Sequence, residues 1–224
     1  MIKMRPIRKL FPRHFAIWSS LLLICGLNLS GCQMGTTDAA TRGKELFETC
    51  VPCHQQDGSG YPAVGAPNIA GMNDWYVQLQ LENFRAGSRG THFNDVEGMR
   101  MRAMSLSLPS EEDVKAVAHY VGTMPPVRHA PSVRGDPQAG KEVYAICQTC
   151  HGEYGAGNQA VAAPRIAGVD DWYVATELRK FNSGVRGSNP KDRQGRSMRA
   201  VSRGALPDDD AIRNVVAYIA TLKP

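Results

Sequence analysis

The stretches CVPCH at 50–54 and CQTCH at 147–151 decide the fold of this chain. Each follows the pattern C-x-x-C-H, which attaches a c-type haem. The spacing has a physical reason, because two thiols three residues apart reach the two vinyl groups on one edge of a porphyrin. The histidine that follows, His54 or His151, then lies under the iron as its proximal ligand. The sequence therefore predicts two covalently attached haem c groups, held at Cys50, Cys53, Cys147 and Cys150.

Three other uses of a C-x-x-C pair compete with haem attachment. A redox dithiol of the thioredoxin type gives no reason for a histidine after each pair, and the chain shows no βαβ pattern around them. A zinc site is disfavoured, because two widely separated C-x-x-C-H units with no further cysteine leave awkward ligand sets. Structural disulfides are the third alternative in an exported chain. Two copies of the full motif at a fixed offset favour haem attachment over all three.

The chain repeats itself at an offset of 97 residues. The longest match pairs residues 43–60 with 140–157, and the second copy gains one residue shortly before its last match, at 206–219. The segment between the copies contains four prolines, which are typical of a linker. We therefore expect two domains of one fold, with these boundaries: domain 1 at 41–123, a proline-rich linker at 124–137, and domain 2 at 138–224.

Each copy is predicted to be helical. One helix is expected to begin near Thr41 or Ala139, and another near Asn73 or Asp170, where an Asn or Asp can cap it. The last helix is expected to start after the proline at 109 or 207. Its apolar residues recur at i, i+3, i+4 and i+7, at positions 114, 117, 118 and 121, and 212, 215, 216 and 219. The predicted fold class is all-α, with two tandem domains whose thin cores are each wrapped around a haem.

The first 31 residues have the features of a secretory signal. Five basic residues precede an apolar run from Phe15 to Leu29, whose 15 residues are few for a membrane span. An uncleaved anchor is the alternative. The run ends in Leu29-Ser30-Gly31-Cys32, which resembles the cleavage box of bacterial lipoproteins. That resemblance implies loss of 1–31, lipid on Cys32, a polar tether at 32–40, and a protein held at the periplasmic face of a bacterial membrane.

The charge of the chain depends on this signal. The whole sequence has 26 Lys and Arg against 21 Asp and Glu, and the five charges in the signal are all basic. Without them the chain is formally neutral, so its composition gives no support to nucleic-acid binding. The remaining charge is unevenly distributed: residues 33–130 have 8 basic and 11 acidic side chains, and residues 131–224 have 13 and 10.

On these motifs the chain resembles the class I cytochromes c, and most closely their two-domain, two-haem members of the cytochrome c4 type. The resemblance covers nearly all of residues 41–223. In that family the first and last helices of a domain cross at a small residue and an aromatic pair, and the matching residues here are Gly43, Phe47, Tyr120, Gly140, Tyr144 and Tyr218. A proline carbonyl in the family accepts a hydrogen bond from the proximal histidine, and Pro67 and Pro164 match it.

The sixth iron ligand can be identified from the second copy. Met, His or Cys can close that position. Beyond its motif the second copy has no histidine or cysteine, and Met198 is its only methionine. The offset of 97 pairs Met198 with Met101, and the family places this ligand in the loop before the last helix. We therefore expect the iron ligands to be His54 with Met101, and His151 with Met198.

Several other side chains compete for the sixth position. Lysines are the remaining natural rivals in the second copy, at Lys180, Lys191 and Lys223. In the first copy, Met99 and Met104 pair with an arginine and a valine of the second, so we interpret them as packing in the haem pocket or spare sulfur. The histidines without equivalents in the second copy are interpreted as surface or interface residues: His92, His119 and His129.

Iron with both axial positions filled binds no substrate, so the resemblance implies an electron carrier and not an enzyme. The expected partners are a redox-protein donor and acceptor, such as a quinol-oxidising complex and a terminal oxidase or reductase. The basic second domain is expected to face an acidic site on such a partner. Two alternatives are a dihaem enzyme of the peroxidase or thiosulfate dehydrogenase type, and a fixed electron-entry subunit of an oxidase or reductase complex.

Overall fold

The computed structural model describes residues 38–223, and the signal segment, Cys32 and residues 33–37 of the tether lie outside them. The secondary structure in the described range is helical, with only two isolated bridges between extended residues. The elements of the first domain are α1 (Ala39–Phe47), α2 (Val51–His54), η1 (Pro62–Val64), α3 (Asp74–Arg85), α4 (Val96–Leu106) and α5 (Glu111–Thr123). Those of the second are α6 (Pro137–His151), η2 (Gln159–Val161), α7 (Asp171–Ser183), α8 (Arg193–Ala205) and α9 (Asp209–Thr221). The fold is therefore two tandem helical domains, as the sequence predicted.

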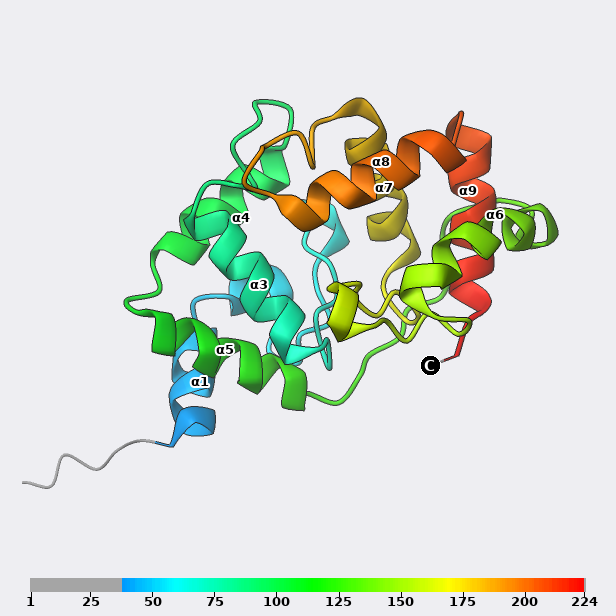
Figure 1. Cartoon of the computed structure of the whole chain (residues 1–224). Helices are drawn as coiled ribbons and strands as arrows, with labels where there is room; N and C mark the ends of the chain where they lie inside the picture. Colours follow the sequence, from blue (N-terminus) through cyan, green and yellow to red (C-terminus); the bar gives the residue numbers. More distant parts are fainter. Residues whose placement is uncertain (1–37, 224) are drawn as a thin grey trace, which may run out of the picture. The chain divides into compact units, whose positions relative to one another are not determined.

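In each domain the first and last helices cross at a glycine. Helix α1 crosses α5 and α6 lies against α9 (Figure 1). A Cβ atom on Gly43 would lie 2.1 Å from the carbonyl oxygen of Ala116, and one on Gly140 would lie 1.9 Å from that of Asn214. Only glycine allows the two backbones to come this close.

An aromatic pair completes each crossing. The ring centroids of Phe47 and Tyr120 lie 5.5 Å apart, and those of Tyr144 and Tyr218 lie 5.2 Å apart. Both pairs have the tilted or edge-on geometry that aromatic rings prefer. The crossing residues expected from the sequence therefore meet in both copies.

The helices begin at residues that explain their positions. Helices α1 and α6 start two residues before Thr41 and Ala139, because the side chains of Asp38 and Asp136 accept hydrogen bonds from the first turn. Ser110 and Asp208 cap α5 and α9 in the same way. These last two helices turn their predicted apolar stripes inward.

The caps expected at the start of α3 and α7 do not form. Asn73 and Asp170 occupy the N-cap positions, but neither side chain accepts a hydrogen bond from its own helix. Asp170 instead accepts one from the backbone amide of Asn68 in the other domain, at 2.8 Å. The Asp170 carboxylate, which could have capped α7, is therefore used in a contact with the other domain.

The methionines expected in a loop lie on helices. Met101 is in α4 and Met198 is in α8. The second copy gains one residue after this methionine, and its helical segment is two residues longer, with 13 residues in α8 against 11 in α4. The loop prediction was wrong because each helix is held by an aspartate cap, Asp95 or Asp192, and not by an apolar stripe.

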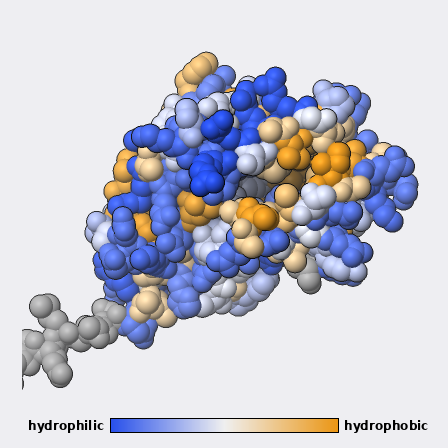
Figure 2. All heavy atoms as spheres, viewed as in Figure 1, coloured by the Kyte–Doolittle hydropathy of each residue, from blue (hydrophilic) through white to orange (hydrophobic). Residues whose placement is uncertain are grey.

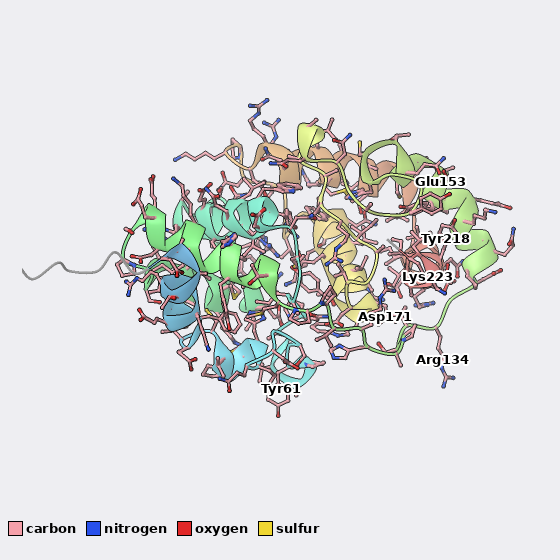
Figure 3. The ribbon with its side chains drawn as sticks, turned by 90° about the horizontal axis from the view of Figure 1, so that it is seen from below. Tyr61, Arg134, Glu153, Asp171, Tyr218 and Lys223 are labelled. Atoms are coloured by element: carbon pink, nitrogen blue, oxygen red, sulfur yellow. The ribbon has the colours of Figure 1, made fainter. Side chains whose placement is uncertain are left out.

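The segment between the domains is fixed to the start of α7. The carboxylate of Asp171, labelled in Figure 3, accepts hydrogen bonds from the backbone amides of Ser132 and Val133 at 2.6 and 2.5 Å. The ring of His129 lies 2.8 Å from the Asp170 carboxylate. These contacts hold the proline-rich segment against the second domain. None of the helices in residues 38–223 has the length and apolar character needed to span a bilayer.

Candidate haem sites

The proximal histidine of the first domain is oriented by a backbone carbonyl. His54 ends the short helix α2, and its Nδ1 donates a hydrogen bond to the carbonyl oxygen of Pro67 at 2.9 Å. The opposite ring atom, Nε2, is buried and has no hydrogen-bond partner. Burial lowers the pKa of His54, and the Pro67 carbonyl opposes this effect only in part. The ring is therefore neutral and presents an unused lone pair, which is what an iron ligand requires.

The second domain repeats this geometry on a longer helix. His151 ends α6, and its Nδ1 donates to the Pro164 carbonyl oxygen at 2.8 Å. Burial lowers the pKa of His151 as well, against the effect of the Pro164 hydrogen bond. The two proline carbonyls matched by the resemblance thus lie at equivalent places.

In each domain, one motif cysteine is half-buried and the other is exposed. Cys50 and Cys147 are half-buried, whereas Cys53 and Cys150 are exposed, and none of the four forms a disulfide. Burial raises the pKa of the Cys50 thiol, and it raises that of Cys147 to about 11. The arrangement gives no support to the alternative of structural disulfides.

The structure separates the three methionines of α4. Met101 packs against the apolar core of the first domain, as Met198 packs against that of the second. Met99 and Met104 are 40% and 39% exposed. Met101 is the α4 methionine whose side chain lies with the core. The role expected for Met99 and Met104, packing in the haem pocket or spare sulfur, stays a prediction.

A cavity of about 880 Å³ lies mainly in the second domain, and Met72, Tyr76 and Gln80 of the first domain also line it. Its lining is mainly apolar, and Figure 2 shows a hollow with apolar side chains along its rim. His151 and Met198 both line it, as do the two motif cysteines. Such a volume is within the range that bound cofactors occupy. The residues present therefore fit a haem, with the imidazole and the thioether as the two candidate axial ligands.

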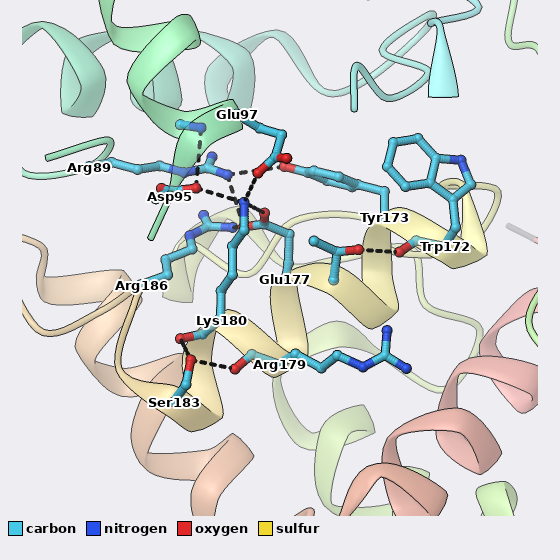
Figure 4. A network of polar contacts seen from close by, with 12 residues as sticks. Arg89, Asp95, Glu97, Trp172, Tyr173, Glu177, Arg179, Lys180, Ser183 and Arg186 are labelled. Carbon is cyan, nitrogen blue, oxygen red and sulfur yellow. Dashed lines mark hydrogen bonds and ion pairs between the residues drawn. The ribbon is translucent and has the colours of Figure 1, made fainter. Parts of the chain in front are cut away.

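A buried cluster of charged and polar groups lies where the two domains meet (Figure 4). Arg89 of the first domain donates to Glu177 of the second at 2.9 Å and to Gln80 of its own domain at 2.8 Å. Arg186 makes the reciprocal contacts, to Glu177 and, at 2.9 Å, to Gln80. Both guanidinium groups also reach a tyrosine hydroxyl of the opposite domain.

The charges of this cluster are strongly coupled. Burial would raise the pKa of the Glu177 carboxyl, but the charges of Arg89 and Arg186 outweigh it and lower that pKa to about 2. The Nε atoms of both arginines are buried and lack partners. The Nε atoms of Arg102 and Arg199 are also buried without partners, and of these four arginines Arg186 lines the cavity of the second domain.

Sequence reasoning missed this cluster. The offset of 97 pairs Arg89 with Arg186 and Gln80 with Glu177. The one hint in the sequence was that neutral Gln80 is equivalent to charged Glu177. Nothing in a single sequence indicates that both positions are buried in one interface.

Other side chains that were candidates for the sixth iron position make different contacts. Lys180 is held by carboxylates, with its Nζ 2.6 Å from Asp95. His119 is exposed, and His92 accepts a hydrogen bond from the Asn94 amide. His129 lies against Asp170.

Comparison with known proteins agrees with this geometry. The cytochrome c family model matches residues 40–125 and again 137–223. The chain is 29% identical over 184 residues to a thiosulfate dehydrogenase electron acceptor of Stutzerimonas stutzeri, covering 77% of this chain and 78% of that one.

Two solved structures are similar. The crystal structure of reduced cytochrome c4 from Pseudomonas stutzeri matches with a TM-score of 0.63 and 26% identity, over 82% of this chain and 98% of the other. The thiosulfate dehydrogenase TsdBA of Marichromatium purpuratum matches with a TM-score of 0.65 and 31% identity, over 82% of this chain but only 40% of that longer one. Two matched domains and two haem-binding motifs lead to one conclusion: the chain belongs to the cytochrome c family, as a dihaem electron-transfer protein with two covalently attached haem c groups.

Proposed function

We propose that this protein carries single electrons between redox proteins at the periplasmic face of a bacterial membrane, to which a lipid on Cys32 holds it. Bound haem supplies each domain with one iron that changes between the ferrous and ferric states. The proposed axial ligands are His54 with Met101, and His151 with Met198. The observation that carries the proposal is the pair of His54 Nε2, buried without a partner, and Met101, packed against the core of the same domain.

The protein groups around each site keep it closed to other chemistry. The Pro67 and Pro164 carbonyls fix the imidazole rings, so that Nε2 remains the free ligand atom. The Met101 and Met198 thioethers would be the second ligands, and methionine ligation would favour electron transfer at a raised potential. A haem held by both side chains would have no position left for a substrate. These features support a carrier over a peroxidase or a dehydrogenase.

Absorption spectra of the holoprotein test the ligand assignment. Methionine-ligated ferric haem shows a weak far-red band, which two such haems should give at twice the strength of one. We expect Met101→Leu to remove half of this band, and Met198→Leu to remove the other half. Met99→Leu and Met104→Leu are the matched controls and should leave it intact. An unchanged band in Met101→Leu would overturn the assignment.

Helix α8 is the proposed docking surface for an acidic partner. Arg193, Arg196 and Arg203 are exposed on it, and α8 contains no acidic residue. The electron donor proposed here is a periplasmic dehydrogenase or a quinol-oxidising complex, because the S. stutzeri relative is named as an acceptor for thiosulfate dehydrogenase. The acceptor would be a terminal oxidase or reductase.

Charge reversal tests the docking proposal. Replacing Arg193, Arg196 and Arg203 by glutamate should slow electron transfer at low ionic strength, and added salt should reduce the difference. The control is reversal of Lys115, an exposed lysine of the first domain. Equal rates for the triple variant and the wild type would refute this surface. Recovery of the protein with an intact membrane complex would instead favour a fixed subunit over a free carrier.

A further inference from the structure

Helices α4 and α8, which carry the two proposed methionine ligands, begin in the same way. The carboxylate of Asp95 accepts a hydrogen bond from the Gly98 amide at 3.2 Å, and Asp192 accepts one from Gly195 at 2.7 Å. A Cβ atom at either glycine would lie 2.0 Å from the capping carboxylate. The start of each helix therefore depends on an aspartate that closes tightly over a glycine. Its position sets where the methionine on the helix lies.

At α4 the cap has a second partner, from the other domain. The ammonium group of Lys180, on α7, lies 2.6 Å from the Asp95 carboxylate and 2.9 Å from that of Glu97 (Figure 4). The Asp95 side chain is 3% exposed and that of Lys180 is 12% exposed. This ion pair is therefore largely shielded from water, where such pairs are costly to break.

The ammonium group remains charged in this setting. Burial by itself would lower the pKa of Lys180, but Glu177, Asp95 and Glu97 outweigh it and raise the pKa above its ordinary value. Glu177 lies 3.6 Å from the ammonium group, one helical turn away. Lys180 thus connects the α4 cap to the buried cluster at the domain interface.

The reverse contact does not exist. The residue equivalent to Lys180 in the first domain is Asn83, whose side chain accepts a hydrogen bond from Ser88 of its own domain. The residue equivalent to Glu97 is Gln194. Within residues 38–223, the Asp192 carboxylate makes no ion pair with the first domain. The Asp192 cap therefore lacks an ion pair from the other domain, although Asn189, just before α8, donates a hydrogen bond to the Gly87 carbonyl of the first domain at 3.0 Å. Helix α4 differs because its capping carboxylate is itself held by a charge of the opposite domain.

We propose that Lys180 is a positioning residue for the first haem, because it fixes the helix that carries Met101 from the opposite domain. The axial ligand of the first haem then depends on an ion pair between the domains, and that of the second does not depend on Lys180. The proposal rests on Met101 being the ligand, as in the proposed function. It concerns the geometry of the ligand helix and not the chemistry of the iron.

Competition with imidazole tests the proposal on the oxidised holoprotein. Imidazole displaces a methionine ligand, and the loss of the far-red band reports the displacement. In Lys180→Gln we expect half of the band to be lost at an imidazole concentration about tenfold lower than in the wild type. The other half should be lost at the wild-type concentration. Lys180→Arg should restore the wild-type curve, and Lys191→Gln, an exposed lysine of the same domain, should not change it.

Two backgrounds assign the halves. In Met198→Leu only the first haem contributes to the band, and there Lys180→Gln should shift the whole curve. In Met101→Leu only the second contributes, and there it should shift nothing. A shift in both backgrounds would overturn the proposal, because it would indicate general destabilisation. Equal curves with and without Lys180→Gln in the Met198→Leu background would also overturn it.

The same design separates two kinds of failure. If Met101→Leu alone leaves the band intact, the ligand assignment is wrong, and the positioning role fails with it. If Met101→Leu halves the band while Lys180→Gln changes no curve, the assignment stands and only the positioning role is wrong. Asp95→Asn retains a capping side chain but removes the charge of the cap that Lys180 contacts, while Glu97 and Glu177 still face the ammonium group. In that background Lys180→Gln should lose most of its effect on the first haem.

Discussion

The two domains are nearly identical where they hold haem and different where they touch each other. The histidine, its proline carbonyl, the helix crossing and the methionine repeat at fixed offsets. At the interface, the repeat makes Gln80 and Asn83 of the first domain equivalent to Glu177 and Lys180 of the second. Two neutral residues in one domain therefore correspond to two charged residues in the other. The comparison teaches that requirements of the cofactor preserved the repeat, while the contact between the copies diverged.

Removing both thiols of one haem motif should have the largest effect, because it removes the haem from one domain and leaves it in the other. Cys147→Ala with Cys150→Ala leaves one haem, as does Cys50→Ala with Cys53→Ala. Each variant domain loses the group that fills its thin core, and we expect a loss of more than about 5 kcal/mol in its free energy of unfolding. Protein mass and the haem absorption spectrum measure the number of haems. The first variant should also weaken the far-red band of the remaining haem more than the second does.

Glu177→Gln should destabilise the interface by about 3–5 kcal/mol at neutral pH, because it leaves two buried guanidinium groups without their shared carboxylate. Adding Gln80→Glu moves the carboxylate to the other domain. This double variant should recover most of the loss, since Arg89 and Arg186 contact both positions. Urea unfolding measures both changes. A double variant no more stable than Glu177→Gln would show that the two positions are not equivalent.

The effect of Glu177→Gln should also depend on pH. The folded-state pKa of Glu177 is about 2, below its ordinary value of 4.5. The stabilisation from this carboxylate is therefore fully present above pH 4.5 and is lost as the pH falls through about 2. The difference in unfolding free energy between wild type and variant should shrink across that window. A difference that stays constant would contradict the depressed pKa.

Gly43→Ala and Gly140→Ala should each destabilise their domain by about 3 kcal/mol, because the new methyl group meets a backbone carbonyl that cannot move away. The equal clash predicts equal losses, which would confirm that the crossings are equivalent. Gly204→Ala is the matched control, since a Cβ atom there meets nothing within 4 Å. That variant should be neutral or slightly stabilising. Unfolding curves measured by far-ultraviolet circular dichroism compare the three.

Arg179→Gln should have the smallest effect. It removes the ion pair with Asp209, in which both side chains are 45% exposed, and the first domain has glutamate at the equivalent position. We expect a loss of about 0.5 kcal/mol, which should vanish at high salt. A larger loss that persists at high salt would mean that this surface pair contributes more than exposed pairs usually do.

The sequence predicted the parts of this molecule that local patterns determine. The haem motifs, the helix crossings at Gly43 and Gly140, and the inward stripes of α5 and α9 all lie within one repeat. The offset of 97 also separated Met101 from its two neighbours, and the core packing of its side chain agrees with that choice. The ligand assignment itself, the domain boundaries and the lipid on Cys32 stay predictions.

The sequence could not predict what depends on distant contacts. The apolar periodicity of α4 is weak, and α8 has few apolar residues among its arginines, glycines and serines. The spacing Asp95 to Gly98, repeated at Asp192 and Gly195, was the signal that could have revealed them. The pairing of Lys180 with Asp95 joins residues 85 positions apart. No local rule connects such a pair, and it became visible only when both helices were in place.

The single carboxylate between Arg89 and Arg186 bears on how a two-domain chain of this kind can arise. A homodimer of one ancestral domain would place the same residue at both positions, and so would have two buried glutamates or none. Two copies that differ in sequence can have glutamine at one position and glutamate at the other. A single chain with both copies therefore allows a charge arrangement that a symmetric homodimer does not: one buried carboxylate shared by two guanidinium groups.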